Sequence, residues 1–376
     1  IQLFLDDLRK NLKIQDWQVA QAENAVKLYV NHFLPKKPNA PAAETQKENQ
    51  HTFPSATAVR QKIREALRIK HYAYSTERTY SDWFARFYDY LTKIKKKDWQ
   101  NQGANEEDVR DFLSHLAIKQ HVSSSTQNQA FNALLFLFRH VLQIDLKDLS
   151  KTVRAKRGPK LPVVLSVDEV RQLLSHTTGR DLLVLHILYG TGMRLTEVAR
   201  LRVNDVDFSG NAIFVRAGKW DKDRTTVLPQ AVINPLKAHL KKVKDLHEKD
   251  LAKGLGETNL PEALERKYPH AGKEWRWQYV FPANNLSVDP RSGKVRRHHI
   301  SADVIQKAVA EAVRAAGIPK HATVHTLRHS FATHLLMAGV NIREVQELLG
   351  HKNVETTMIY THVMRDMAHA PQSPLD

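Results

Sequence analysis

Apolar residues recur every three or four positions along most of this chain, and this spacing restricts it to a mainly helical fold. Two short runs, at residues 213–215 and 225–228, read instead as strands and predict a β-hairpin. The expected fold class is therefore mainly α with a small β-sheet (α+β). The clearest helical faces are Tyr80, Trp83, Phe84 and Phe87 near the start, and Leu327, Phe331 and Leu335 near the end.

The balance of charge narrows the class of partner. Lys and Arg number 57 against 40 Asp and Glu, a formal net charge of +17. Such an excess favours a polyanion, because each neutralised phosphate releases counterions; a merely basic protein is the alternative. The sequence holds no Cys, which excludes disulfides, thiolate metal sites and a cysteine nucleophile. The sequence contains no uninterrupted apolar run of about 18 residues or more, so it predicts no membrane span. Asp6 and Asp7 argue against a signal peptide, so we expect a cytoplasmic protein.

Changes in composition divide the chain into segments. Prolines and polar residues follow the first helical patterns, and a run of five basic residues with two prolines (KTVRAKRGPKLP) separates two longer patterned regions. We expect the aromatic residues of the first region to form its core rather than a base-stacking platform. The predicted segments are a helical N-terminal extension and linker (1–50), a helical domain (57–150), a basic linker (151–162), a second domain (163–365) and a tail (366–376).

The second domain contains the groups that cleavage of a phosphodiester needs when no metal takes part. Fixed cations must hold the non-bridging oxygens, where charge accumulates, and arginine suits this role. A nucleophile must attack, and a proton must reach the leaving oxygen. Each candidate alone has a commoner reading as an ion pair or a packing residue. The candidates are Arg194 with Glu197 three residues later, His325 with Arg328 three residues later, His351 after Gly350, and Tyr360.

Three strings in this order resemble the signature of the tyrosine recombinases, the phage integrase family, over at least residues 163–363. They are LYGTGMRLTEVARLRVNDVDF (188–208), HTLRHSFATHLL (325–336) and QELLGHKNVETTMIYTHV (346–363). The resemblance implies a helical core-binding (SAM-like) domain and a catalytic domain that form a clamp around DNA. It also implies an enzyme of the bacterial cytoplasm that uses neither a metal nor a cofactor.

The same resemblance assigns roles to single residues. Tyr360 would attack the phosphate, leaving a 3′-phosphotyrosyl bond and a free 5′-hydroxyl. Because a tyrosine with a pKa of ~10 needs help near neutral pH, our own hypothesis is that either His325 or His351 takes its proton. Lys219, in AGKWDKDR, would protonate the leaving oxygen, with Lys222 as the rival because Trp220 and Asp221 depart from the family's small residues. Glu197 would orient its neighbours. The residues around the phosphate would be Arg194, His325, Arg328 and His351.

An additional segment at about 261–300 and the closing SPLD (373–376) resemble the integron integrases, which integrate and excise gene cassettes. This resemblance implies DNA partners of two kinds, a double-stranded integration site and a cassette site folded as a single-stranded hairpin, bound by a homotetramer. In the other reading, Trp275, Trp277 and Phe281 only pack the segment onto the body. The residues that would hold extrahelical bases are Trp277, Pro290, His298 and His299, and those that would meet phosphates are Arg296 and Arg297.

Four other functions compete with this one. One competing reading makes the histidines metal ligands, but no HExxH motif or carboxylate cluster accompanies them. A DNA-binding regulator without catalysis would need none of the candidate catalytic residues. A type IB topoisomerase shares the chemistry, and a phage or chromosome-dimer recombinase would act on duplex sites. The histidines concerned are His325, His329, His334 and His351.

Overall fold

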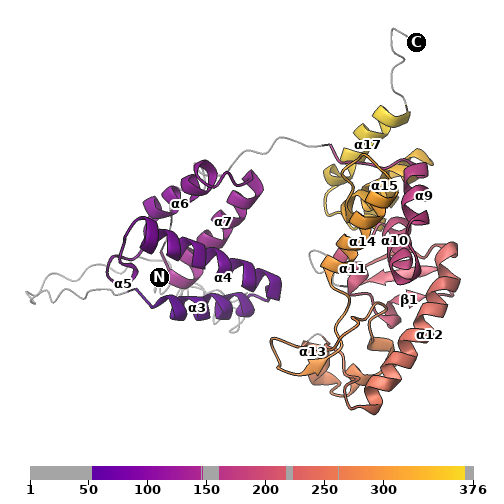
Figure 1. Cartoon of the computed structure of the whole chain (residues 1–376), viewed down its shortest axis with the longest axis horizontal. Helices are drawn as coiled ribbons and strands as arrows, with labels where there is room; N and C mark the ends of the chain where they lie inside the picture. The colour runs from indigo at the N-terminus through magenta and orange to yellow at the C-terminus, as the bar shows by residue number, and fades with distance from the viewer. Residues whose placement is uncertain (1–52, 145, 147–160, 217–222, 261, 369–376) are drawn as a thin grey trace, which may run out of the picture. The chain divides into compact units, whose positions relative to one another are not determined.

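The computed structural model describes residues 53–144, 146, 161–216, 223–260 and 262–368 (Figure 1). The chain divides between residues 157 and 158 into two compact units, which are described separately below. The predicted N-terminal extension, most of the basic linker and the end of the C-terminal tail lie outside the described residues.

The first unit is helical throughout its described residues. Its helices begin at side chains that accept hydrogen bonds from the first turn, among them Ser55, Asn105 and Ser123. Two of them end in a π-helical turn. The elements are α3 (Ala56–Ile69), α4 (Tyr74–Asp89) with η1 (Tyr90–Ile94), α5 (Trp99–Gln102), α6 (Glu106–Ile118), and α7 (Ser124–Phe136) with η2 (Leu137–Leu142).

The aromatic residues of this unit form its core. Trp83, Phe84 and Phe87 are buried, and Tyr80 packs against the same cluster. The ring of Phe87 lies edge-on to that of Phe112 of α6, with 5.4 Å between centroids. The prediction that these residues pack the domain, rather than stack on bases, is confirmed.

The second unit is also mainly helical. Its first helix starts at the predicted capping box, in which Ser166 and Glu169 each accept a hydrogen bond from the other's backbone. The helices are α9 (Val167–Ser175), α10 (Gly179–Thr191), α11 (Leu195–Ala199), α12 (Gln230–Ala252), α13 (Glu262–Lys267), α14 (Ala302–Ala315), α15 (Val324–Met337), α16 (Ile342–Leu349) and α17 (Glu355–Ala368), with 3₁₀ turns η3 (Val203–Asp205), η4 (Ala271–Lys273) and η5 (Trp275–Trp277).

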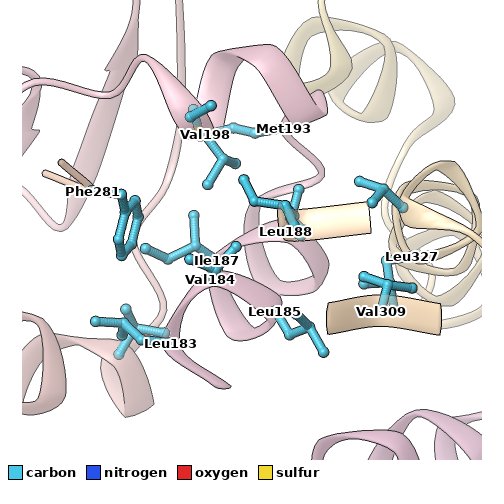
Figure 2. Close-up of a cluster of buried hydrophobic side chains, with 14 of the residues drawn as sticks. Leu183, Val184, Leu185, Ile187, Leu188, Met193, Val198, Phe281, Val309 and Leu327 are labelled. Atoms are coloured by element: carbon cyan, nitrogen blue, oxygen red, sulfur yellow. The ribbon is translucent and has the colours of Figure 1, made fainter. Parts of the chain in front are cut away.

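Helix α10 lies at the centre of this unit. Six of its thirteen residues are buried, and its apolar side chains share one core with Val309 of α14 and Leu327 of α15 (Figure 2). The helix ends at Gly192, whose left-handed φ of 62° turns the chain sharply into Arg194. The first candidate catalytic residue is thus attached to a helix that is anchored in the core of the unit.

A small antiparallel sheet flanks this core, in the order β1 (Val206–Asp207), β2 (Ala212–Val215), β3 (Arg224–Val227). The predicted hairpin is confirmed as β2 and β3, and β1 adds a third strand. Val215 pairs with Arg224 at the end of the hairpin where residues 217–222, with Lys219 and Lys222, lie outside the described residues. With the helices around it, the sheet confirms the predicted α+β fold class.

The additional segment is attached to the second unit by both backbone and side chains. Val280 N donates to Leu201 O at 2.8 Å, and Phe281 is fully buried in the core (Figure 2). The segment also contains a hairpin of its own, formed by β4 (Ser287–Val288) and β5 (Val295–Arg296). In this hairpin Val288 is 64% and Val295 46% exposed. The packing reading therefore holds for Phe281, while the hairpin presents apolar side chains to solvent.

Among the described residues, no helix is both long and apolar enough to cross a membrane.

Phe281→Ala is expected to lower the free energy of unfolding by about 3–5 kcal/mol, because it leaves a cavity in the core. Val288→Ala, in the same segment but exposed, should stay within about 0.5 kcal/mol of the parent. Urea unfolding followed by circular dichroism measures both variants. Equal effects of the two substitutions would contradict the packing described here.

Candidate active site

Three arginines from distant parts of the second unit meet at the C-terminal end of α16. Each guanidinium donates a hydrogen bond to one of the carbonyls that a helix leaves unpaired at this end. The negative end of the helix dipole also favours cations there. The bonds run from Arg224 Nε to Leu348 O (2.9 Å), from Arg328 Nη2 to Leu349 O (2.6 Å) and from Arg194 Nη2 to Gly350 O (3.3 Å).

Glu197 supplies a carboxylate to two of these arginines. It accepts from Arg194 Nη1 at 2.8 Å and, through both oxygens, from Arg224 Nη1 and Nη2 at 2.9 and 2.6 Å. Burial by itself raises the pKa of Glu197, but the hydrogen bonds and charge of Arg224, with those of Arg194, outweigh burial and lower the pKa to about 2. Glu197 is therefore ionised, and it fixes the orientation of both guanidiniums.

Arg328 is the most buried of the three arginines, at 4% exposure. Its Nη1 donates to Gly192 O at 2.5 Å and its Nη2 lies 3.0 Å from His351 Nε2. Burial first, and then the charge of Arg194, lowers the pKa of Arg328 to about 9. Arg328, whose charged form is destabilised by burial and by Arg194, makes with Arg194 a seat for an anion, because a bound anion would offset the charge of both guanidiniums.

The protonation of His351 follows from its contacts. A guanidinium can only donate, so Nε2 accepts from Arg328 and the proton of the ring is on Nδ1. Nδ1 in turn lies 2.9 Å from Thr357 Oγ1. Burial, followed by the charges of Arg328 and Arg194, lowers the pKa of His351 to about 3. Neutral His351 thus holds Arg328, and its acceptor nitrogen is already occupied.

Tyr360 is buried on α17, against the same group. Its ring is parallel to that of His351, with 6.3 Å between centroids and 16° between planes. Burial raises the pKa of Tyr360, although Arg328 and Arg194 oppose the rise. The hydroxyl lies 2.9 Å from Nδ1 of His329. His325 lies one helical turn before His329, and part of its side chain is exposed. Partial desolvation, followed by the charge of Arg328, lowers the pKa of His325.

The structure thus brings together Arg194, Glu197, Arg328, His351 and Tyr360, with His325 at the exposed edge. Lys219 and its rival Lys222 lie outside the described residues.

Sequence reasoning missed two members of the site. Arg224 was present as the last residue of AGKWDKDR, at the start of the second predicted strand, and its place beside Lys219 was the available signal. His329 was considered only as a metal ligand, although its spacing of four from His325 places both on one face of a helix. Both residues act through partners far away in the sequence, Leu348 and Tyr360 respectively, which a local motif does not reveal.

Two of the residues predicted at the additional segment have to be corrected. Arg296 is 4% exposed, and its guanidinium is paired with carboxylates rather than presented to phosphates. Arg297 is held by both oxygens of Asp250, at 2.5 and 2.9 Å. Buried guanidiniums need such partners, and these contacts anchor the β4–β5 hairpin. The partners of Arg296 are Glu257, Glu265, Asp289 and Asn259.

The four residues that are predicted to hold extrahelical bases differ in their exposure. Pro290 and His298 are exposed, and Trp277 and His299 are half-buried. The rings of His298 and His299 are 4.0 Å apart and both contact Tyr279. Burial lowers the pKa of His299 to about 4, so it is neutral at pH 7.

Among the described residues, no group of three or more His, Asp or Glu side chains has the arrangement of a metal site. His325 and His329, two of the histidines in the competing metal-ligand reading, lie close together on α15, with 6.5 Å between their ring centroids.

Comparison with known proteins agrees with this geometry. Residues 163–367 match the profile of the phage integrase family, and residues 59–148 match that of the phage integrase N-terminal SAM-like domain. An Escherichia coli protein named integrase/recombinase is 46% identical over 317 residues, which cover 84% of this chain and 92% of that protein. The tyrosine recombinase XerA of Thermococcus kodakarensis is 32% identical over 282 residues, covering 74% of this chain and 84% of XerA.

The fold of this chain also resembles that of solved structures. The XerH site-specific recombinase bound to difH substrate, in a pre-cleavage complex, aligns with a TM-score of 0.53 and 22% identity over 85% of each chain.

Gly350→Ala is expected to destabilise the protein by at least 1 kcal/mol more than Gly317→Ala, on the order of one lost charged hydrogen bond. Both glycines have a left-handed φ, +64° and +63°, so both variants carry the same backbone strain of about 1–2 kcal/mol. Only at Gly350 would the new Cβ meet a side chain, 2.7 Å from Arg224 Cδ. Urea unfolding measures the difference, and equal losses would show that Arg224 is not held where we describe it.

Glu197→Gln is expected to change how stability depends on pH. The folded-state pKa of Glu197 lies below its usual 4.5, so its contribution is present above pH 4.5 and is lost as pH falls toward about 2. The loss is on the order of 3 kcal/mol in the wild type and absent in the variant. At pH 7 the variant should be less stable by about 3–5 kcal/mol, because buried guanidiniums lose their carboxylate. Unfolding free energies measured from pH 7 to 3 test this; parallel curves would contradict it.

Proposed function

This chain belongs to the phage integrase family and is a tyrosine site-specific recombinase; on that basis we propose that Tyr360 attacks a DNA phosphate held by Arg194 and Arg328. The observation that carries the proposal is the anion seat itself, in which two guanidiniums converge beside a buried tyrosine at the end of α16. Arg194 keeps 21% of its side chain exposed, so DNA can reach it from solution.

The neighbouring residues take supporting roles. Glu197 and Arg224 orient Arg194, and His351 orients Arg328. Because the guanidiniums are fixed before DNA arrives, they stabilise charge on the phosphate oxygens without reorganising. The attack forms a 3′-phosphotyrosyl bond and releases a 5′-hydroxyl, whose oxygen receives a proton from Lys219, with Lys222 as the alternative donor. His325, at the exposed edge of the seat, contacts the phosphate.

We further propose that the DNA is of the integron kind, with a cassette site folded as a single-stranded hairpin that carries extrahelical bases. The support is the surface of the additional segment. Its hairpin is held rigidly by Arg296 and Arg297, yet Val288, Val295 and Pro290 are exposed. Apolar and ring side chains on a rigid support suit the faces of unpaired bases, which stack with little sequence preference.

The ring residues beside the hairpin support the same proposal. His298 is exposed and is backed by the rings of His299 and Tyr279. Although part of the His298 ring is exposed, partial desolvation lowers its pKa as well, so a neutral ring is available for stacking. Four protomers would assemble when two sites are exchanged.

Recombination of duplex sites is the second candidate. It fits the comparisons equally well, since neither the family nor the 32% identity to a tyrosine recombinase named XerA distinguishes the two kinds of site. The two candidates share the seat and Tyr360 and differ only in what the additional segment contacts.

A covalent-trapping experiment tests the proposal. Two libraries of nicked DNA are incubated with the protein in EDTA, one of hairpin strands with extrahelical bases and randomised arms, the other of fully paired duplexes. Covalent adducts are recovered from denaturing gels and sequenced. We expect an adduct with wild type, none with Tyr360→Phe, and enrichment of the hairpins. Enrichment of duplexes would transfer the proposal to the second candidate, and binding without any adduct would indicate a regulator.

The library also tests the role of the ring residues. His298→Ala should reduce adduct formation on selected hairpins by about 5- to 150-fold, the equivalent of one lost stacking contact of ~1–3 kcal/mol. Deletion of the extrahelical bases should remove the difference between His298→Ala and wild type. If the difference persisted on fully paired DNA, His298 would not be a base contact.

A further inference from the structure

The Tyr360 hydroxyl has one hydrogen-bond partner among the described side chains, and it is a residue to which the sequence strings give no part in the reaction. His329 Nδ1 lies 2.9 Å from Tyr360 Oη, and the two rings are 5.5 Å apart at 50°. We infer that His329 takes the proton from Tyr360 when the tyrosine attacks DNA. The inference rests on the proposed function and adds the base that the reaction needs.

The other two histidines are less suited to this role. His351 already uses Nε2 to accept from Arg328, and its Nδ1 carries the proton that faces Thr357. His325 is exposed, and its nearest described ring is His329, 6.5 Å away. A general base must lie within hydrogen-bond reach of the proton it removes, and of the three histidines only His329 does so.

The protonation of His329 is compatible with the role. Burial, followed by the charges of His325 and Arg328, lowers its pKa to about 4, so the ring is neutral and one nitrogen carries a lone pair. With the ring proton on Nε2, Nδ1 accepts from the Tyr360 hydroxyl. A DNA phosphate in the seat would offset the charge of Arg328 and raise the pKa of His329. The base would therefore become stronger only when substrate is bound.

The step balances in both directions. The Tyr360 Oη–phosphorus bond forms as the phosphorus–O5′ bond breaks. The Tyr360 proton passes to His329 Nδ1, which becomes an imidazolium, while the leaving O5′ takes a proton from the acid assigned to Lys219. On rejoining, the 5′-hydroxyl of a strand attacks the phosphorus and gives its proton back to the group assigned to Lys219. The phosphorus–Tyr360 Oη bond breaks, and His329 returns its proton to Tyr360. His329 is then neutral again for the next cycle.

His329→Asn is the direct test, because an asparagine side-chain atom can replace Nδ1 in the hydrogen bond but cannot take up a proton at neutral pH. His334→Asn is the matched control, since His334 Nδ1 makes an equivalent bond to Tyr189 Oη, also 2.9 Å, on the same helix. The substrate is a nicked strand selected from the libraries, made once with an ordinary phosphate and once with sulfur in place of O5′. Sulfur leaves without a proton and so removes any need for an acid.

We expect His329→Asn to form the adduct about 10²- to 10⁴-fold more slowly than wild type, with oxygen and with sulfur alike. Its rate should rise with pH, about tenfold per unit below the pKa of Tyr360, because phenolate must then form in solution. His334→Asn should form the adduct at the wild-type rate. Lys219→Ala should form it slowly on the ordinary phosphate, and the strand with sulfur in place of O5′ should restore the rate. His329→Ala, with its adduct rate restored by added imidazole, repeats the test should the Asn variant fold poorly.

The outcomes separate this inference from the proposed function. Wild-type rates in His329→Asn, or restoration of its rate by sulfur, would overturn the role of His329 while Tyr360-dependent cleavage stands. Failure of imidazole to restore His329→Ala, in folded protein that binds DNA, would overturn it as well. If wild type formed no adduct that depends on Tyr360, the proposed function would fall, and His329 with it.

Discussion

The site depends on the C-terminal end of α16, where Arg194, Arg224 and Arg328 each donate to one of its last carbonyls. Three guanidiniums repel one another, so they remain together only where fixed negative groups offset them. The helix end supplies its carbonyls and its dipole, and Glu197 supplies a full charge. Gly350 makes the approach possible, because its left-handed φ ends the helix and its missing Cβ leaves room for Arg224.

The fold delivers the remaining groups to this point from rigid elements. Arg194 follows the sharp end of buried α10, Arg328 and His329 are consecutive on α15, and His351 follows directly after α16. The phenol of Tyr360, on α17, is packed between His351 and His329. A phosphate entering the seat meets cations that are already oriented and a nucleophile whose hydroxyl already faces a neutral base. In this account the guanidiniums need not reorient when the phosphate binds, and the anion itself completes the balance of charge.

Much of the fold and of the site could be predicted from the sequence, and the predictions that failed did so for physical reasons. Periodicity predicted the helices, and the capping box at Ser166 and the hairpin at 213–228 depend on neighbours close in the chain. Arg224 and His329 were missed because their partners lie more than 30 residues away or across the fold. Arg296 and Arg297 were misjudged because charge in a sequence does not reveal whether a carboxylate such as Asp250 will neutralise it. The roles of Lys219 and Lys222 remain predictions.

A structure of the protein with nicked DNA and vanadate tests the central claim most directly, since vanadate mimics a phosphate under attack. The account predicts vanadium bonded to Tyr360 Oη, its oxygens within hydrogen-bond distance of Arg194 and Arg328, and His329 Nδ1 still beside Oη. Glu197 and Arg224 should stay paired and hold no contact with the anion. Vanadate bound away from the end of α16, or Arg328 turned away from it, would contradict the account.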